Sequence, residues 1–247
     1  MQTRVINSIA SLIKALGKAT NSKYGPVWYR GHACSSWKLE PHYDRLSNPM
    51  KEEELVNRFR QNANLLLSHS PAKPLDFGWI FLMQHYGVPT RLLDWTESPL
   101  VALYFAVEDR IVAHQKEDGA IWLLYPQQLN KHSTREPSYI PSFDDEWLNT
   151  YSVEQYSKGK DLGILPVAAI ATRNNPRIQA QLGVFTISHL KKTPIEEIED
   201  GKHCVKLTIP AAAKPAIMRE LKTLGITRFQ IFPELTSIGD NLREELL

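Results

Sequence analysis

Residues 83–107 read MQHYGVPTRLLDWTESPLVALYFAV and place polar groups inside a strongly apolar run. Gly87 is positioned to end a helix in a left-handed turn, and Pro89 disfavours helical backbone at the residue before it. The next five residues are therefore expected to run extended. Ser98 and Pro99 are typical of a helix N-cap and first turn, and the apolar residues after them keep helical spacing. The stretch thus predicts a helix end, an extended turn and a capped helix.

The polar and aromatic groups of this stretch fall on the turn and the helix start, where binding groups are commonly presented. They are His85, Tyr86, Arg91, Asp94, Trp95, Thr96, Glu97 and Ser98. Single residues have structural alternatives, since Arg91 and Asp94 can pair with other charges and Ser98 can act only as a cap. Their density nevertheless favours a functional pocket.

Composition restricts the class of protein. The chain has 247 residues, of which 43% are hydrophobic and 23% charged, so it can bury a substantial core as a single domain. Because 29 basic residues face 27 acidic ones, no global field directs it to nucleic acid or membrane. Cys34 and Cys204 are interpreted as reduced thiols, and no signal or membrane-spanning segment is evident. A cytoplasmic protein without a membrane partner is expected.

Patterns of apolar residues predict an α+β fold with N-terminal helices packed on a mixed or antiparallel sheet. An amphipathic helix is expected at 3–17, and a second from Asn48 to about Ser68, whose glutamates 52–54 are explained by the helix dipole. Polar residues 127–162 are predicted to form a lid or insertion. Strands are expected at 26–31, 119–125, 164–170, 184–188, 204–209 and 227–232, with late helices from Pro215 and from Pro233 to Leu247.

Familiar catalytic motifs are missing from the sequence. No glycine spacing matches a dinucleotide fingerprint or P-loop, and neither G-x-S-x-G nor HExxH occurs. No metal is therefore expected. Cys34 is interpreted as a small buried thiol.

Several separated motifs resemble the FRG domain, named for its aromatic-Arg-Gly motif, over roughly residues 25–240. They are Tyr29-Arg30-Gly31, then Trp37, Leu39, Pro41 and Arg45, then 85–107, then 177–186, and finally 231–235. The resemblance implies a single domain spanning 1–247 of a kind found in bacteria and phages.

A more distant similarity is to ADP-ribosyltransferases, which order an arginine, a hydroxyl-bearing motif leading into a helix, and a late Glu or Gln motif in the same way. This resemblance implies a split sheet and NAD as substrate, used by a toxin or phage-defence effector on a protein or nucleic acid. It implies catalytic roles for Arg30, Asp94, Glu97 and Gln181. The residues that it suggests for binding NAD are Tyr29, Arg30, Gly31, His85, Tyr86, Arg91, Thr96 and Ser98.

The chemistry of NAD fits these residue types. Arg30 or Arg91 can hold a diphosphate through two parallel hydrogen bonds. The sequence departs from the transferase pattern at Gln181, which has no negative charge, so Asp94 or Glu97 must supply it. Two alternatives stay open: a non-catalytic domain that recognises a nucleotide or nucleic acid, and a hydrolase.

Overall fold

The computed structural model describes residues 4–20, 24–67, 70–71, 76–108, 114–134, 139–160, 163–173 and 175–246. Its centre is one open seven-stranded mixed sheet with the order β1-β7-β4-β2-β3-β6-β5. The strands are β1 (Arg4–Val5), β2 (Trp28–His32), β3 (Leu92–Thr96), β4 (Gly119–Leu124), β5 (Val167–Ala169), β6 (Gly183–Ile187) and β7 (Cys204–Ile209). Only β1 and β7 pair in parallel among these strands. The predicted α+β class is confirmed.

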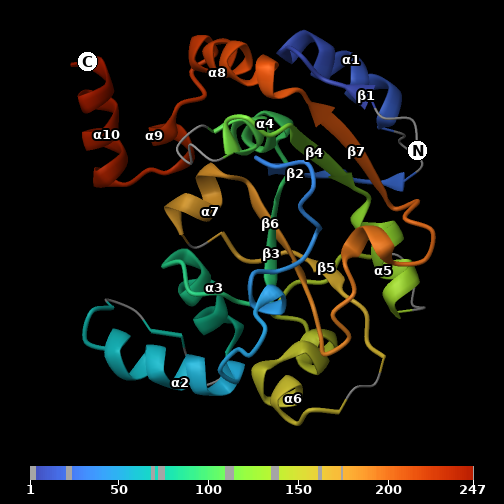
Figure 1. The fold of residues 1–247 in the computed structure, drawn as a ribbon. Helices are drawn as coiled ribbons and strands as arrows, with labels where there is room; N and C mark the ends of the chain where they lie inside the picture. The colour runs from blue at the N-terminus through green and yellow to red at the C-terminus, as the bar shows by residue number, and fades with distance from the viewer. Residues whose placement is uncertain are drawn as a thin grey trace.

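A narrow join divides the sheet into two halves. The register pairs β2 with β3 at one position, Tyr29 with Thr96, whereas β2–β4 and β3–β6 each pair over five positions. Figure 1 shows the strands of the two halves running in different directions. The resemblance implied a split sheet, and the structure has one continuous sheet with this weak connection.

Helices cover both halves and enclose separate core clusters (Figure 1). They are α1 (Ile9–Ala19), α2 (Glu52–Ala63), α3 (Phe77–His85), α4 (Pro99–Val107), α5 (Pro126–Thr134), α6 (Val153–Ser157), α7 (Pro176–Ala180), α8 (Lys214–Thr223), α9 (Arg228–Ile231) and α10 (Leu235–Glu245). Side chains of α1, α4 and α8 pack on β2, β4 and β7. Those of α2, α3 and α6 pack on β3, β5 and β6.

The central stretch folds as its sequence predicts. Helix α3 ends at His85, and Gly87 adopts a φ of +79°. Ser98 caps α4, its hydroxyl accepting a hydrogen bond from the Val101 amide at 3.4 Å. Six of the nine residues of α4 are buried, which explains why this helix carries almost no polar side chains.

The N-terminal prediction is wrong in its first turn. Arg4 and Val5 form β1 along the edge of β7, and helix α1 begins only after the capping serine, Ser8. Val5 is accordingly exposed rather than inward-facing. Sheet pairing overrides the helical period here; Thr3, the first residue of the predicted helix, lies outside the described residues.

Two further predictions, the start of a helix and the last strand, are wrong. Helix α2 begins at Glu52 rather than Asn48 and ends at Ala63; Ser68 lies outside the described residues. The predicted last strand, 227–232, contains helix α9, because four residues are too few for periodicity to separate helix from strand. Arg228 holds α9 in place through ion pairs with Glu108 and Asp240.

Residues 127–162 contribute to the core where the structure describes them. This segment holds most of α5, a 3₁₀ turn η4 (Glu146–Tyr151) and α6; residues 135–138 and 161–162 lie outside the described part. Leu148 and Val153 are fully buried. The described residues of the predicted lid therefore pack against α2 and the sheet rather than over a site.

Gly31 permits the close packing of α4 on β2. A Cβ at this position would overlap the carbonyl oxygen of Ala102, and one at Gly119 would lie 2.6 Å from the carbonyl oxygen of Ala106. The two glycines thus let the α4 backbone lie directly on the sheet.

We expect Gly31→Ala to lower the free energy of unfolding by about 3 kcal/mol, because two backbone segments must separate. Gly17→Ala is the matched control, since a Cβ at this position would have nothing within 4 Å and alanine favours helix α1. Urea unfolding of the two variants measures the difference. Equal stability of Gly31→Ala and the wild type would contradict this account of the packing.

Candidate functional site

A pocket of about 240 Å³ lies at the narrow join of the sheet. Tyr29 and Thr96, the paired residues of β2 and β3, both line it. Its polar lining consists of Arg30, Gln84, His85, Asp94, Thr96, Arg177 and Gln181. Its aromatic lining consists of Tyr29, Phe81, Trp95, Phe105 and Phe185. Segments far apart in the sequence therefore combine an aromatic floor with charged and amide groups at one place.

Arg30 is fixed in the wall of this pocket. One guanidinium nitrogen donates to the backbone oxygen of Asp94 at 2.5 Å, and Nε donates to Nε2 of His32 at 3.0 Å. Burial lowers the pKa of Arg30 from its usual value, the neighbouring Asp94 opposes this shift, and Arg45 adds to it. A guanidinium normally titrates so far above neutrality that it keeps its charge. Arg30 thus presents a fixed positive charge to the pocket.

His32 is a neutral acceptor that orients Arg30. Its side chain is buried, and burial together with the charge of Arg30 lowers its pKa to about 2. A neutral imidazole has one nitrogen that accepts a hydrogen bond, and Nε2 fills that role toward Arg30. His32 was not among the predicted site residues; its position two residues after Arg30, on the same face of a strand, was the available signal.

Asp94 is the acidic side chain that lines the pocket. It is exposed on β3, and Oδ2 accepts a hydrogen bond from Nε2 of Gln84 at 2.8 Å. Gln84 in turn accepts a hydrogen bond from the Thr90 hydroxyl. Gln84 lies in α3, the helix that precedes the turn, and was not among the predicted site residues. The amide holds the carboxylate at the boundary of the pocket.

Gln181 lines the same pocket as Asp94, just before the start of β6. The Thr96 hydroxyl donates to the backbone oxygen of Gln181 at 2.6 Å, and Gln181 Nε2 donates to the backbone oxygen of Ile231 at 3.2 Å. Its side-chain oxygen has no hydrogen-bond partner within the described parts of the chain. That oxygen can accept a hydrogen bond from a ligand hydroxyl.

His85 and Arg177 form one end of the pocket. Arg177 donates to the backbone oxygen of His85 at 3.2 Å, and its guanidinium lies 4.8 Å from the centre of the Phe232 ring. Burial, and secondarily the charge of Arg177, lower the pKa of His85. Arg177 belongs to the motifs that carry the family resemblance, but it was not among the predicted site residues.

Three predicted residues lie outside the lining of the pocket. Tyr86, at the C-terminal end of α3, is 63% exposed. Glu97 forms an ion pair with Arg173, and Ser98 is occupied as the cap of α4. The structure therefore does not bring these three residues into the pocket, and their roles stay predictions. Gly31 does line the pocket, and its missing side chain serves the packing of α4.

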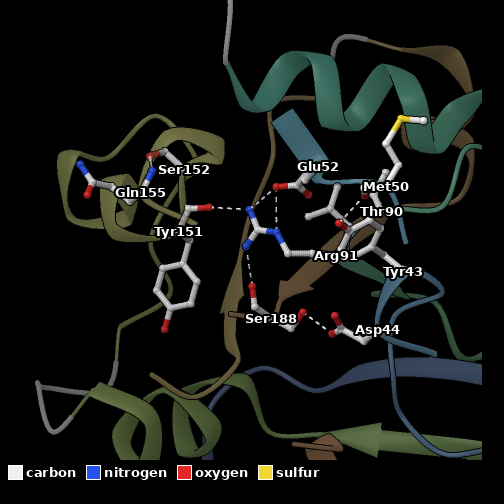
Figure 2. A network of polar contacts seen from close by, with 11 residues as sticks. Tyr43, Asp44, Met50, Glu52, Thr90, Arg91, Tyr151, Ser152, Gln155 and Ser188 are labelled. Carbon is white, nitrogen blue, oxygen red and sulfur yellow. Dashed lines mark hydrogen bonds and ion pairs between the residues drawn. The ribbon is translucent and has the colours of Figure 1, made fainter. Parts of the chain in front are cut away.

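Arg91 also lies outside the lining of the pocket and is completely buried. Its guanidinium bonds to Glu52 at 2.7 and 2.9 Å, and to the backbone oxygens of Ser188 at 2.6 Å and Tyr151 at 2.9 Å (Figure 2). It also lies 3.9 Å from the centre of the Tyr156 ring. Arg91 is thus a structural centre, and Glu52 is its buried partner as well as a first-turn acid of α2.

A second pocket of about 240 Å³ adjoins the first. The two pockets share Arg30, Gln84 and Asp94 as a common wall. Glu40, His42 and Arg45 contribute most of the other polar groups of the second pocket.

The comparison with protein families matches residues 25–115 to the FRG domain. This part of the chain is therefore similar to FRG domains. It contains the pocket residues Arg30, His85 and Asp94, whereas Gln181 joins the pocket from outside the match through the pairing of β6 with β3. No match was found among curated proteins or among solved structures. Within the described residues, no helix has the length and apolar character needed to cross a membrane.

We expect Arg91→Met to lower the free energy of unfolding by about 3–5 kcal/mol, because it leaves the Glu52 carboxylate buried without its partner. The double variant Arg91→Met/Glu52→Gln should recover part of this loss. Arg58→Met is the control, since Arg58 makes an exposed ion pair with Glu54. Chemical denaturation measures all three, and a loss for Arg91→Met no larger than for Arg58→Met would exclude the structural role.

The low pKa of His32 predicts a loss of stability in acid. Unfolded histidine binds a proton below a pH of about 6.5, whereas folded His32 does not until about pH 2. The stabilisation from neutral His32 is thus present above pH 6.5 and declines by about 1.4 kcal/mol per pH unit below it. His32→Asn should flatten the dependence of unfolding free energy on pH, and the exposed His42→Asn should not. Parallel pH curves for His32→Asn and the wild type would contradict the assignment.

Proposed function

We propose that the pocket binds NAD and that the protein transfers ADP-ribose from it to a macromolecular acceptor, either a protein or a nucleic acid. The observation that supports this most is the convergence of Arg30, Asp94 and Gln181 on one aromatic-lined pocket. These residues come from three separate motifs, carried by or adjacent to the neighbouring strands β2, β3 and β6. Convergence of a cation, an anion and an amide beside aromatic rings suits a dinucleotide.

Arg30 is proposed to hold the diphosphate of NAD. Its orientation is already fixed by His32 and by the Asp94 carbonyl, so little conformational entropy is lost on binding. A ring of the ligand would lie against the aromatic floor, where Tyr29 contributes a buried face. The size of this pocket suits part of the dinucleotide.

Asp94 is proposed to stabilise the positive charge that develops on the ribose as the bond to nicotinamide breaks. The electron pair of that bond leaves with neutral nicotinamide. The acceptor forms a new bond to the same ribose carbon and gives its proton to the Asp94 carboxylate. Gln181 would bind a ribose hydroxyl through its side-chain oxygen. The missing glutamate of the third motif is thereby replaced from the central stretch.

A cytoplasmic effector of bacterial or phage origin is part of the same proposal. Both cysteines are buried free thiols, as suits a reducing compartment in which NAD is present.

A non-catalytic recognition domain is the second candidate. The observation in its favour is Gln181 itself, which brings no negative charge and donates its amide to Ile231 rather than into the pocket. This candidate predicts saturable binding of NAD without release of nicotinamide.

The decisive measurement is nicotinamide release from NAD by the purified protein, with cell extract as the source of acceptors. We expect Asp94→Asn to lower the rate by about 10²–10⁴-fold because a charged group at the reaction centre is lost. Arg30→Ala should mainly weaken NAD binding. Glu97→Gln is the matched control, three residues from Asp94 and paired with Arg173 outside the pocket.

Equal activity of Asp94→Asn and Glu97→Gln would remove Asp94 from the mechanism. Binding of NAD by the folded protein without nicotinamide release would favour the recognition domain. No binding at all would reject both candidates.

A further inference from the structure

The second pocket lies across the wall formed by Arg30, Gln84 and Asp94. Its outer side is built by the segment that leads into the 3₁₀ turn η2 (Tyr43–Arg45), which brings Glu40, His42 and Arg45 to the same cavity. Neither the family match nor the proposed NAD chemistry gives this cavity a role.

Arg45 is the distinctive residue of the second pocket. Its side chain is exposed, and among the described residues it has no hydrogen-bond or ion-pair partner. The guanidinium of Arg30 lines the same cavity, and the charge of Arg45 contributes to lowering the pKa of Arg30 after the larger effect of burial. Two like charges therefore face one space, and a bound anion between them would relieve their repulsion.

We propose that the second pocket binds a phosphate group carried by a nucleotide or a nucleic-acid strand. Guanidinium groups recognise phosphate oxygens through paired, charge-assisted hydrogen bonds, and Arg45 has its donors available for them. The exposed His42 adds a further hydrogen-bonding group at the same cavity. The pocket is also lined by the carboxylates of Glu40 and Asp94, which suits a ligand that carries hydroxyl or amino donors beside its phosphate.

Phosphate binding at this site would orient an acceptor toward the proposed donor pocket. Asp94 belongs to both cavities, so a hydroxyl or amino group of a ligand in the second pocket would lie next to the carboxylate. That the bound ligand accepts ADP-ribose rests on the proposed function. It narrows the acceptor of the proposed transferase from any macromolecule to a nucleotide or nucleic acid. Phosphate binding itself requires no NAD.

Direct binding without NAD tests the site. The probes are AMP and a fluorescent single-stranded oligonucleotide of about 12 nucleotides, within the usual range of site sizes. Calorimetry measures the first, and fluorescence anisotropy over a series of salt concentrations measures the second. The proteins are wild type, Arg45→Gln and Arg58→Gln, the last replacing an exposed arginine of α2 that does not line the pocket.

We expect both probes to bind saturably and Arg45→Gln to weaken each by at least about 10-fold. The dependence of log K on log salt for the oligonucleotide should fall by about 0.7 with the loss of one phosphate contact. Arg58→Gln should match the wild type. Tighter binding of the oligonucleotide than of AMP would identify a strand as the ligand, and equal affinity would identify a free nucleotide.

No saturable binding of either probe by folded protein would overturn the proposal, as would equal affinities of Arg45→Gln and Arg58→Gln. These outcomes are separate from the test of NAD chemistry. Oligonucleotide binding without nicotinamide release would leave the phosphate site standing and reject the transferase. Release of nicotinamide with labelling of protein alone, and no phosphate binding, would support the transferase and reject the phosphate site.

Discussion

The buried charge of Arg91 is the constraint around which one half of the structure is arranged. Moving a guanidinium out of water costs several kcal/mol unless ion pairs and hydrogen bonds replace its hydration. Arg91 obtains these partners from α2, from η4 and from the end of β6, and lies against the Tyr156 ring of α6 (Figure 2). Each of these elements must be in place for the charge to be tolerated. Because Arg91 directly precedes β3, the same contacts fix the strand that carries Asp94.

The other half of the sheet is held by close backbone packing. Gly31 and Gly119 let α4 lie directly on β2 and β4, so this half depends on shape rather than on charge. The halves meet at the Tyr29–Thr96 pair, and the Arg30 side chain continues the connection by donating to the Asp94 carbonyl. A pocket forms at this join because few strand contacts close it. The contacts of Arg91 in one half and the close packing of α4 in the other keep the polar groups of the pocket in position.

Local rules predicted the central stretch well because its signals are local. Gly87, Ser98 and Pro99 act within a few residues, and the helix end and cap follow from their chemistry. Arg30 and Asp94, which the motifs singled out, both line the pocket. The role of Arg91 could not, because its partner Glu52 lies 39 residues away and already had a sufficient explanation in the helix dipole. Gln84 and the phenylalanines of the aromatic floor were missed because their helical or strand spacing is also that of an ordinary core.

Geometry separates the two carboxylates that the sequence left as alternatives. Asp94 and Glu97 are three residues apart, but β3 ends at Thr96. Only Asp94 is therefore held by strand pairing, through its partner Phe185 on β6. Glu97 lies beyond the strand and is neutralised by Arg173. Asp94 instead receives one amide hydrogen bond from Gln84, which orients a carboxylate without cancelling its charge. A charge kept in this way, between two pockets and beside Arg30, is available to a ligand in either of them.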